Sequence, residues 1–210
     1  IKSVKIGQEI SPISTAGWFF QCSNLSEGDF TNLNTSNTIN MSGMFDQIGT
    51  NVETLNFVGL DTWNTSNVKD MSQMFFKLEK LGGPNWNIGN IKNWDVSSVT
   101  NFRMMFERVG RNTEEFHLDI TGWNLASGES TNQMFYGVGG ENTDIYLNLS
   151  NWNLGSTESI SGMFRRFGAN AQNIEIEGLN TWNTSNIKDM NYTFYEFGVR
   201  VEEISLNLTG

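Results

Sequence analysis

Few side chains in this sequence are of the types that enzymes use as nucleophiles or as transition-metal ligands. The chain has one histidine, His117, and one cysteine, Cys22. A catalytic triad or a zinc site needs several such groups brought together. A lone cysteine forms no internal disulfide and most often packs as a small apolar side chain. The sequence therefore predicts a protein that is not an enzyme and that has no cofactor.

Carboxylates offer a second chemistry, the binding of a hard cation. Asp119, Asp144, Glu175 and Glu177 lie in segments of alternating polarity, from which they could bridge calcium ions. Such a site needs several convergent oxygen ligands. Because this sequence shows no pattern that makes the oxygens converge, calcium binding is the less favoured interpretation, and we predict no metal site.

The charge balance excludes a further class of function. With 13 basic and 23 acidic residues, the chain has a formal net charge of -10. Nucleic-acid binding relies on clustered lysines and arginines, and here the basic residues are scattered along the sequence, so we expect no nucleic-acid partner. Since no apolar run approaches the ~20 residues of a membrane helix, we also expect no membrane insertion in this segment.

The elements that position these side chains form an internal repeat. Trp63, Trp94, Trp123, Trp152 and Trp182 are separated by 31, 29, 29 and 30 residues, and a phenylalanine follows each tryptophan after twelve residues. A constant spacing of large apolar residues indicates packing positions. We therefore predict that the tryptophans and the phenylalanines form a core. These phenylalanines are Phe75, Phe106, Phe135, Phe164 and Phe194.

Each repeat divides into a predicted strand and a predicted short helix. Apolar residues alternate at 116–120, 145–149 and 204–208, which indicates strands with one buried face. At 55–60, 86–91 and 174–179 the last apolar gap is three, which indicates an extra residue at the end of the strand. The segment "SNVKDMSQMF" (residues 66–75) has helical spacing, with Ser66 or Asn67 as its cap. The Asn or Asp after each tryptophan is expected to bond the turns of neighbouring repeats.

One such unit cannot bury its apolar face alone, but stacked units can. Strands joined by a crossover run parallel, with right-handed connections. The predicted fold is an α/β repeat, a leucine-rich-repeat-like right-handed solenoid with a parallel β-sheet and short α or 3₁₀ segments. We expect residues 1–210 to form a single solenoid of six to seven repeats of 26–31 residues. Both ends of the sequence fall within repeats, so we expect it to be a fragment of a longer array.

The motifs "WNTSNVKDMSQMF" and "LNTSNTINMSGMF" closely resemble the repeat of BspA-like leucine-rich-repeat surface proteins, a bacterial repeat first noted in mycoplasma lipoproteins. The resemblance covers residues ~30–210 clearly. It implies an outward-displayed, non-enzymatic solenoid that mediates attachment and protein–protein contact. Relatives among viral and phage structural proteins imply the alternative, a structural component of a larger assembly such as a virion decoration or fibre.

The predicted outward-facing strand positions are the best candidates for binding a partner, because they vary between repeats while the core positions persist. Solenoids bind partners on such extended surfaces. The expected partner is a protein or glycan receptor at a cell surface, or neighbouring subunits of an assembly. This mildly acidic face comprises Asn56, Asn87, His117, Asp119, Tyr146, Asn148, Glu175, Glu177, Ser205 and Asn207.

Overall fold

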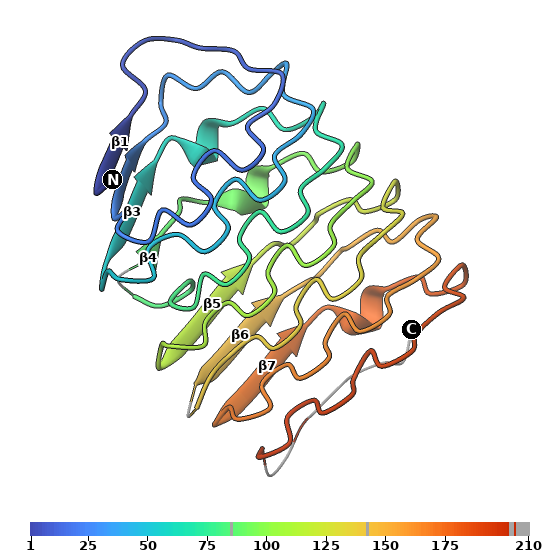
Figure 1. Cartoon of the computed structure of the whole chain (residues 1–210). Helices are drawn as coiled ribbons and strands as arrows, with labels where there is room; N and C mark the ends of the chain where they lie inside the picture. The colour runs from blue at the N-terminus through green and yellow to red at the C-terminus, as the bar shows by residue number, and fades with distance from the viewer. Residues whose placement is uncertain (85, 142, 202–203, 205–210) are drawn as a thin grey trace.

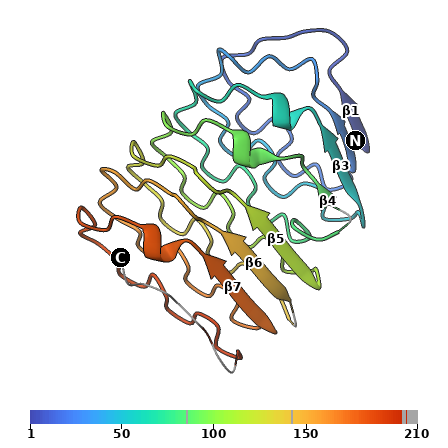
Figure 2. The same cartoon turned by 180° about the vertical axis from the view of Figure 1, so that it is seen from behind.

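The chain winds into a stack of similar coils, with its strands on one side and irregular turn segments on the other (Figures 1 and 2). The computed structural model describes residues 1–84, 86–141, 143–201 and 204. The strands are β1 (Ser3–Lys5), β2 (Glu27–Asp29), β3 (Leu55–Val58), β4 (Trp86–Asn87), β5 (Glu115–Asp119), β6 (Asp144–Asn148) and β7 (Asn173–Glu177). Between them lie the 3₁₀ helices η1 (Leu60–Thr62), η2 (Ile91–Asn93) and η3 (Leu179–Thr181).

The strands form two parallel sheets rather than one. The first has the order β1-β2-β3-β4 and the second β5-β6-β7, and every pair of neighbours is parallel. In the second sheet His117 is opposite Tyr146, which is opposite Glu175. Equivalent residues of successive coils therefore lie side by side and form continuous rows across the face of the sheet.

The three coils with a longer apolar gap are the three that carry a 3₁₀ helix after the strand. Gly59, with φ 94°, precedes η1, and Gly178, with φ 93°, precedes η3. A positive φ turns the chain out of the strand and costs glycine little. The extra residue of these repeats lies after the strand rather than at its end, and it accommodates a 3₁₀ turn.

The predicted helix at 66–75 is not formed, and a ladder of turns replaces it. The amides of Met71 and Gln73 donate to the carbonyls of Asn101 and Arg103 in the next coil, at 3.0 and 2.9 Å, while Met74 donates to Met71 within the coil. Every second residue thus bonds its neighbouring coil, which an α-helix with its internal i→i−4 bonds cannot do. The helical spacing of apolar residues is retained because this ladder also turns one face inward.

The turn ladder requires left-handed backbone at two positions in each coil. In one coil these are Gln73 and Lys77, both with φ 55°; in the next they are Met104 and Arg108, with φ 58° and 59°. This conformation costs an ordinary L-residue about 1–2 kcal/mol. The bonds between coils therefore have to offset a regular local strain.

The side chain of the Asn or Asp that follows each tryptophan bonds its own coil, not a neighbouring one as we expected, whereas the backbone carbonyls of Asn64 and Asp95 do accept from threonines of the preceding coil. The Oδ1 atom of Asn64 accepts from the amide of Ser66 at 3.1 Å and from its hydroxyl at 2.7 Å. Asp95 accepts in the same way from the amide of Ser97 at 3.0 Å. Since this turn uses only an acceptor, Asp and Asn serve equally well, which explains the aspartate in one repeat.

The core is built from two files of stacked aromatic rings, and the predicted core positions are confirmed. The ring of Phe164 lies 5.6 Å from those of Phe135 and Phe194. Trp152 stacks on Trp182 at 5.7 Å, and its indole Nε1 donates to the carbonyl of Ile120 at 2.8 Å. The phenylalanine rings stack from coil to coil between Phe45 and Phe194, which joins the coils into one core. The tryptophan rings stack in two groups, Trp63 on Trp94 and Trp123 on Trp152 on Trp182.

The fold over the described residues is a parallel-strand β-solenoid. The predicted solenoid and parallel sheets are confirmed, whereas the leucine-rich-repeat-like α/β assignment is not, because the helical elements in this part of the chain are three short 3₁₀ turns. The right-handed connection stays a prediction.

One buried carboxyl group in the turn ladder makes the stability depend on pH. Burial raises the pKa of Glu107, with Arg108, Lys77 and Arg103 opposing the shift, and its Oε2 atom is buried without a hydrogen-bond partner. A carboxyl group whose pKa is raised by folding destabilises the folded state when it is ionised, and this penalty disappears as the pH falls below the folded pKa. We therefore expect Glu107→Gln to raise the free energy of unfolding at pH 7. The gain should shrink at acidic pH, as urea titrations at the two pH values can show.

Candidate interaction surface

Eight of the ten predicted partner-binding residues lie on the solvent side of the strands; Ser205 and Asn207 fall outside the described residues. His117, Tyr146 and Glu175 form one row across β5, β6 and β7, and a second row lies two residues further along each strand. Asn56 and Asn87 are a register pair in the first sheet. Whether these residues bind a partner stays a prediction. The second row is Asp119, Asn148 and Glu177.

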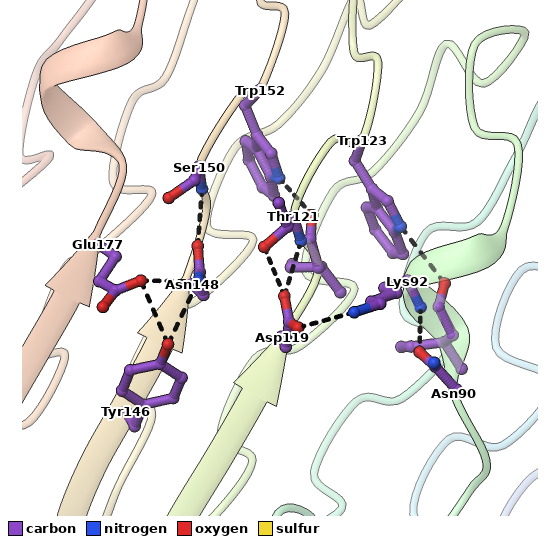
Figure 3. Close-up of polar contacts among 12 residues, drawn as sticks. Asn90, Lys92, Asp119, Thr121, Trp123, Tyr146, Asn148, Ser150, Trp152 and Glu177 are labelled. Carbon is purple, nitrogen blue, oxygen red and sulfur yellow. Dashed lines mark hydrogen bonds and ion pairs between the residues drawn. The ribbon is translucent and has the colours of Figure 1, made fainter.

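The side chains on β6 and β7 are held by a shared set of hydrogen bonds (Figure 3). The Nδ2 atom of Asn148 donates to an Oε2 of Glu177 at 2.7 Å, and the Tyr146 hydroxyl lies 3.2 Å from the same oxygen. The Oδ1 atom of Asn148 accepts from the amide of Ser150 at 3.0 Å. The ring of His117 lies 5.8 Å from that of Tyr146. This part of the face is therefore ordered before any partner arrives.

Asp119 is fixed as an ionised acceptor at the end of β5. It accepts from the amide and the hydroxyl of Thr121, and it pairs with Lys92 at 3.3 Å (Figure 3). Partial burial favours the neutral acid, but these hydrogen bonds and the ammonium group outweigh it and lower the pKa of Asp119. Tyr146 shifts the opposite way: burial and the Glu177 carboxylate raise its pKa although Asn148 opposes this, so the phenol stays neutral at physiological pH.

A groove lies where the two sheets part, between β4 and β5. It encloses about 500 Å³, which is within the usual range for ligand sites. Buried apolar side chains form its floor, among them Leu81, Ile88 and Leu118. Polar side chains form its rim, and four of them belong to the predicted face. Those four are Asn87, His117, Asp119 and Tyr146.

The groove exists because β4 ends after two residues. The Oδ1 atom of Asn87 accepts from the amide of Gly89 at 2.8 Å, and Gly89 has φ 74°. This turn bends the chain away before a longer ladder with β5 can form. Near the start of β5, the amide of His117 donates to the carbonyl of Gly82 at 3.2 Å. The sheets are thus joined at one end of β5 and parted at the other.

The sequence did not predict the groove. We expected 86–91 to be a strand, so Ile88 and Ile91 were interpreted as strand positions. No sequence pattern indicated Asn90, which lines the groove, or Lys92, which pairs with Asp119. The only available clue was the glycine-rich stretch "GGPNWNIGN" (residues 82–90), since glycines between apolar residues often interrupt a strand.

Neither the histidine nor the carboxylates gather into a metal-ligating cluster in the part of the chain that the structure describes, where no group of three or more His, Cys, Asp or Glu side chains is close enough to hold an ion. His117 is exposed, and its Nε2 lies 4.0 Å from Glu115. Across the same described residues, no helix has the length and apolarity that crossing a bilayer requires.

The fold and this face define the class of the molecule, a repeat solenoid that presents a broad polar sheet surface. A family model described as "Mycoplasma protein of unknown function, DUF285" matches residues 13–146, 48–176 and 166–205, and the chain belongs to this family. This family corresponds to the BspA-like repeat family, as the motif resemblance implies. The family match does not confirm the specific motif. No curated protein and no solved structure matches the chain.

Proposed function

We propose that this chain is a non-enzymatic interaction domain, displayed at a cell surface, that mediates attachment by binding a protein partner in the groove between β4 and β5. The observation that carries the proposal is that four of the predicted partner-binding residues converge on one groove with an apolar floor. An apolar floor supplies affinity, and a polar rim supplies specificity. Family membership supports the display of the repeats on a surface.

The charges around the groove favour a partner segment with basic or amide side chains. Asp119 lines the groove and is paired with Lys92, while Glu175 and Glu177 are exposed on β7, beyond the groove on the same face. A basic segment that extends from the groove onto β7 would gain from these carboxylates, and a like-charged one would be repelled. An extended segment also suits the groove. Because β4 and β5 are not paired with each other, the chain beyond β4 and the facing edge of β5 leave strand positions with which an added strand could pair.

The proposal predicts that ligands of this chain depend on His117 and Tyr146. We expect a random peptide library, selected on the wild-type chain, to yield basic sequences that bind the double variant His117→Ala/Tyr146→Ala at least tenfold more weakly. Ten-fold corresponds to about 1.4 kcal/mol, a modest loss for two rim side chains. Both residues are solvent-facing, so the variant should fold normally, as its circular dichroism spectrum would verify.

Tyr195→Ala is the matched control, because Tyr195 is an exposed aromatic residue on the turn side, away from the groove. It should bind the selected peptides as the wild type does. Equal binding by all three proteins, or selection of acidic peptides, would refute the groove as the site. If the peptides fail and an immobilised glycan panel instead shows binding that depends on His117 and Tyr146, the partner is a carbohydrate and the protein-partner proposal is wrong.

A further inference from the structure

The turn side of the stack carries its own row of equivalent side chains, two residues after the core phenylalanine in the five coils from Phe75 to Phe194. All of them have left-handed backbone, with φ between 55° and 64°. The amide of Arg108 donates to the carbonyl of Tyr136, and that of Gly137 to the carbonyl of Arg165, at 2.8 and 2.9 Å. Coil after coil therefore places this residue at the same point. The row runs Lys77, Arg108, Gly137, Arg166 and Glu196.

Gly137 leaves a gap in this row. Where its neighbours carry long side chains, it carries none, and a hollow of about 100 Å³ lies there. Arg108, Arg166 and Arg111 line the hollow together with Tyr136 and the amide side chain of Asn170. All the charged side chains that line it are arginines. These arginines appear scattered along the sequence, and the stacking of coils gathers them.

Two of the three arginines form no ion pair among the described residues, although Arg108 lies close enough to Glu107 to oppose the rise of its pKa. Arg166 pairs with Glu196 at 2.8 Å, whereas Arg108 and Arg111 form no ion pair there. In a chain with a net charge of -10, unpaired arginines that share a hollow are unexpected. Carboxylates do lie in the adjoining hollow, which Arg111 also lines. Glu79 there accepts from Asn112 at 2.6 Å, and Glu141 lies 3.9 Å from Arg200.

A further arginine and a close backbone contact lie beside the hollow. The guanidinium carbon of Arg165 lies 5.7, 5.5 and 5.1 Å from the ring centres of Tyr136, Tyr192 and Tyr195, so a fourth arginine is fixed among aromatic rings beside the row. The backbone carbonyl of Arg111 packs directly on Gly140, where even a Cβ atom would collide with it. The positive charge at this part of the turn side therefore comes from four arginines, and the backbone of one of them is closely packed.

We propose that this hollow binds one oxyanion, a sulfate, phosphate or carboxylate group, between the guanidinium groups of Arg108, Arg111 and Arg166. Guanidinium groups donate paired hydrogen bonds that match the geometry of oxyanions. Tyr136 and Asn170, whose side chains carry further polar groups, line the same hollow. The site shares no lining residue with the groove between β4 and β5, so it does not depend on the function proposed for that groove.

The test is an NMR titration of the ¹⁵N-labelled chain, in which sodium chloride is replaced by sodium sulfate, phosphate or acetate at constant ionic strength. We expect saturable shifts of the Gly137 and Gly139 amides and of the Nε–H signals of Arg108 and Arg111. The anion that saturates the shifts at the lowest concentration identifies the preferred ligand geometry. That geometry is tetrahedral if the anion is sulfate or phosphate, and planar if it is acetate.

Two variants remove the site in different ways. Gly137→Gln fills the hollow and keeps every arginine; it should fold, because Lys77, Arg108, Arg166 and Glu196 already have long side chains at this backbone position. Arg108→Gln/Arg111→Gln keeps the hollow and removes the unpaired charges. Each should weaken the binding of the anion at least tenfold, in line with the loss of charge-assisted hydrogen bonds.

Arg103→Gln is the matched control, since Arg103 is exposed and does not line the hollow. It should bind the anions as the wild type does. The proposal is overturned if the wild type shows no saturable shift, if Gly137→Gln and the arginine double variant both still bind, or if Arg103→Gln loses binding equally. Should one variant fail to fold, as its spectrum would show at once, the other decides.

Discussion

Replacing Trp152 or Phe164 by alanine is expected to lower the free energy of unfolding by about 3–5 kcal/mol, the usual cost of deleting a large core side chain. Both side chains are almost completely buried, at 2% and 0% exposure. Each contacts its counterparts in the coils on both sides, so one deletion weakens two contacts between coils. Trp152→Ala also leaves the carbonyl of Ile120 without the indole donor. Urea denaturation, followed by circular dichroism, measures the loss.

Two exposed residues of the same types provide the control. Trp18 and Phe20 are 38% and 50% exposed, so Trp18→Ala and Phe20→Ala should each cost well under half of the core values. A loss of under ~1 kcal/mol for both core variants would contradict the assignment of these rings to the core. Equal losses at the exposed and the buried sites would do so as well.

Gly59→Ala is expected to cost roughly 3 kcal/mol, because it combines backbone strain with a steric clash. Gly59 has φ 94°, and a Cβ atom there would lie 2.6 Å from the amide nitrogen of Thr31 and 2.8 Å from the carbonyl carbon of Phe30. These are backbone atoms of the preceding coil, so they cannot move aside as a flexible side chain can. The substitution should therefore separate β3 from β2 at the point where η1 begins.

Gly122→Ala separates the two causes. Gly122 also has a positive φ, 80°, but a Cβ atom there would meet nothing within 4 Å. It should cost only the strain, about 1–2 kcal/mol. Thermal and urea denaturation of both variants test the difference. If Gly59→Ala lowered the free energy of unfolding no more than Gly122→Ala does, the close approach of the two coils at Thr31 would be contradicted.

The sequence predicted the stacked core and the side of the strands that faces solvent, because both depend on periodic spacing. The period-two pattern of "EFHLDI" placed His117 and Asp119 outward, and the structure has them exposed. The constant distance from tryptophan to phenylalanine predicted that these rings form the core, and their stacking in two files was found in the structure. Such positions are set by residue type alone, since only large apolar side chains can fill the space between coils.

The turn ladder could not be predicted from the same pattern. Apolar residues at 68, 71, 74 and 75 suit a helix, but they also suit a chain that bonds outward at every second amide. What decides between the two is the neighbouring coil, whose carbonyls accept from Met71 and Gln73. That partner is about 30 residues away, and a local pattern contains no information about it.

The two candidate sites were hidden for a related reason. The groove depends on Asn87 ending its own strand early, and the arginine hollow depends on Gly137 standing between two arginines in adjacent coils. Each is a difference between one coil and the next. The pattern that the repeats share contains no information about such exceptions. For the same reason the arginines appear scattered along the sequence.

The parting of the sheets at β4 and β5 has a mechanical consequence. On the turn side, six amides still cross this boundary at 2.7 to 3.1 Å, those of Phe102, Met104, Phe106, Arg108, Glu129 and Ser130. Along β5 itself the backbone crosses with the bond between His117 and Gly82, and the loop before β5 adds the amides of Gly110 and Asn112. Bending the solenoid so that the groove widens would stretch few hydrogen bonds on the strand side. The resistance of the solenoid to bending should therefore be lowest at this boundary. A ligand seated in the groove would stiffen the rod, and a pulling force that bends it open would loosen the ligand.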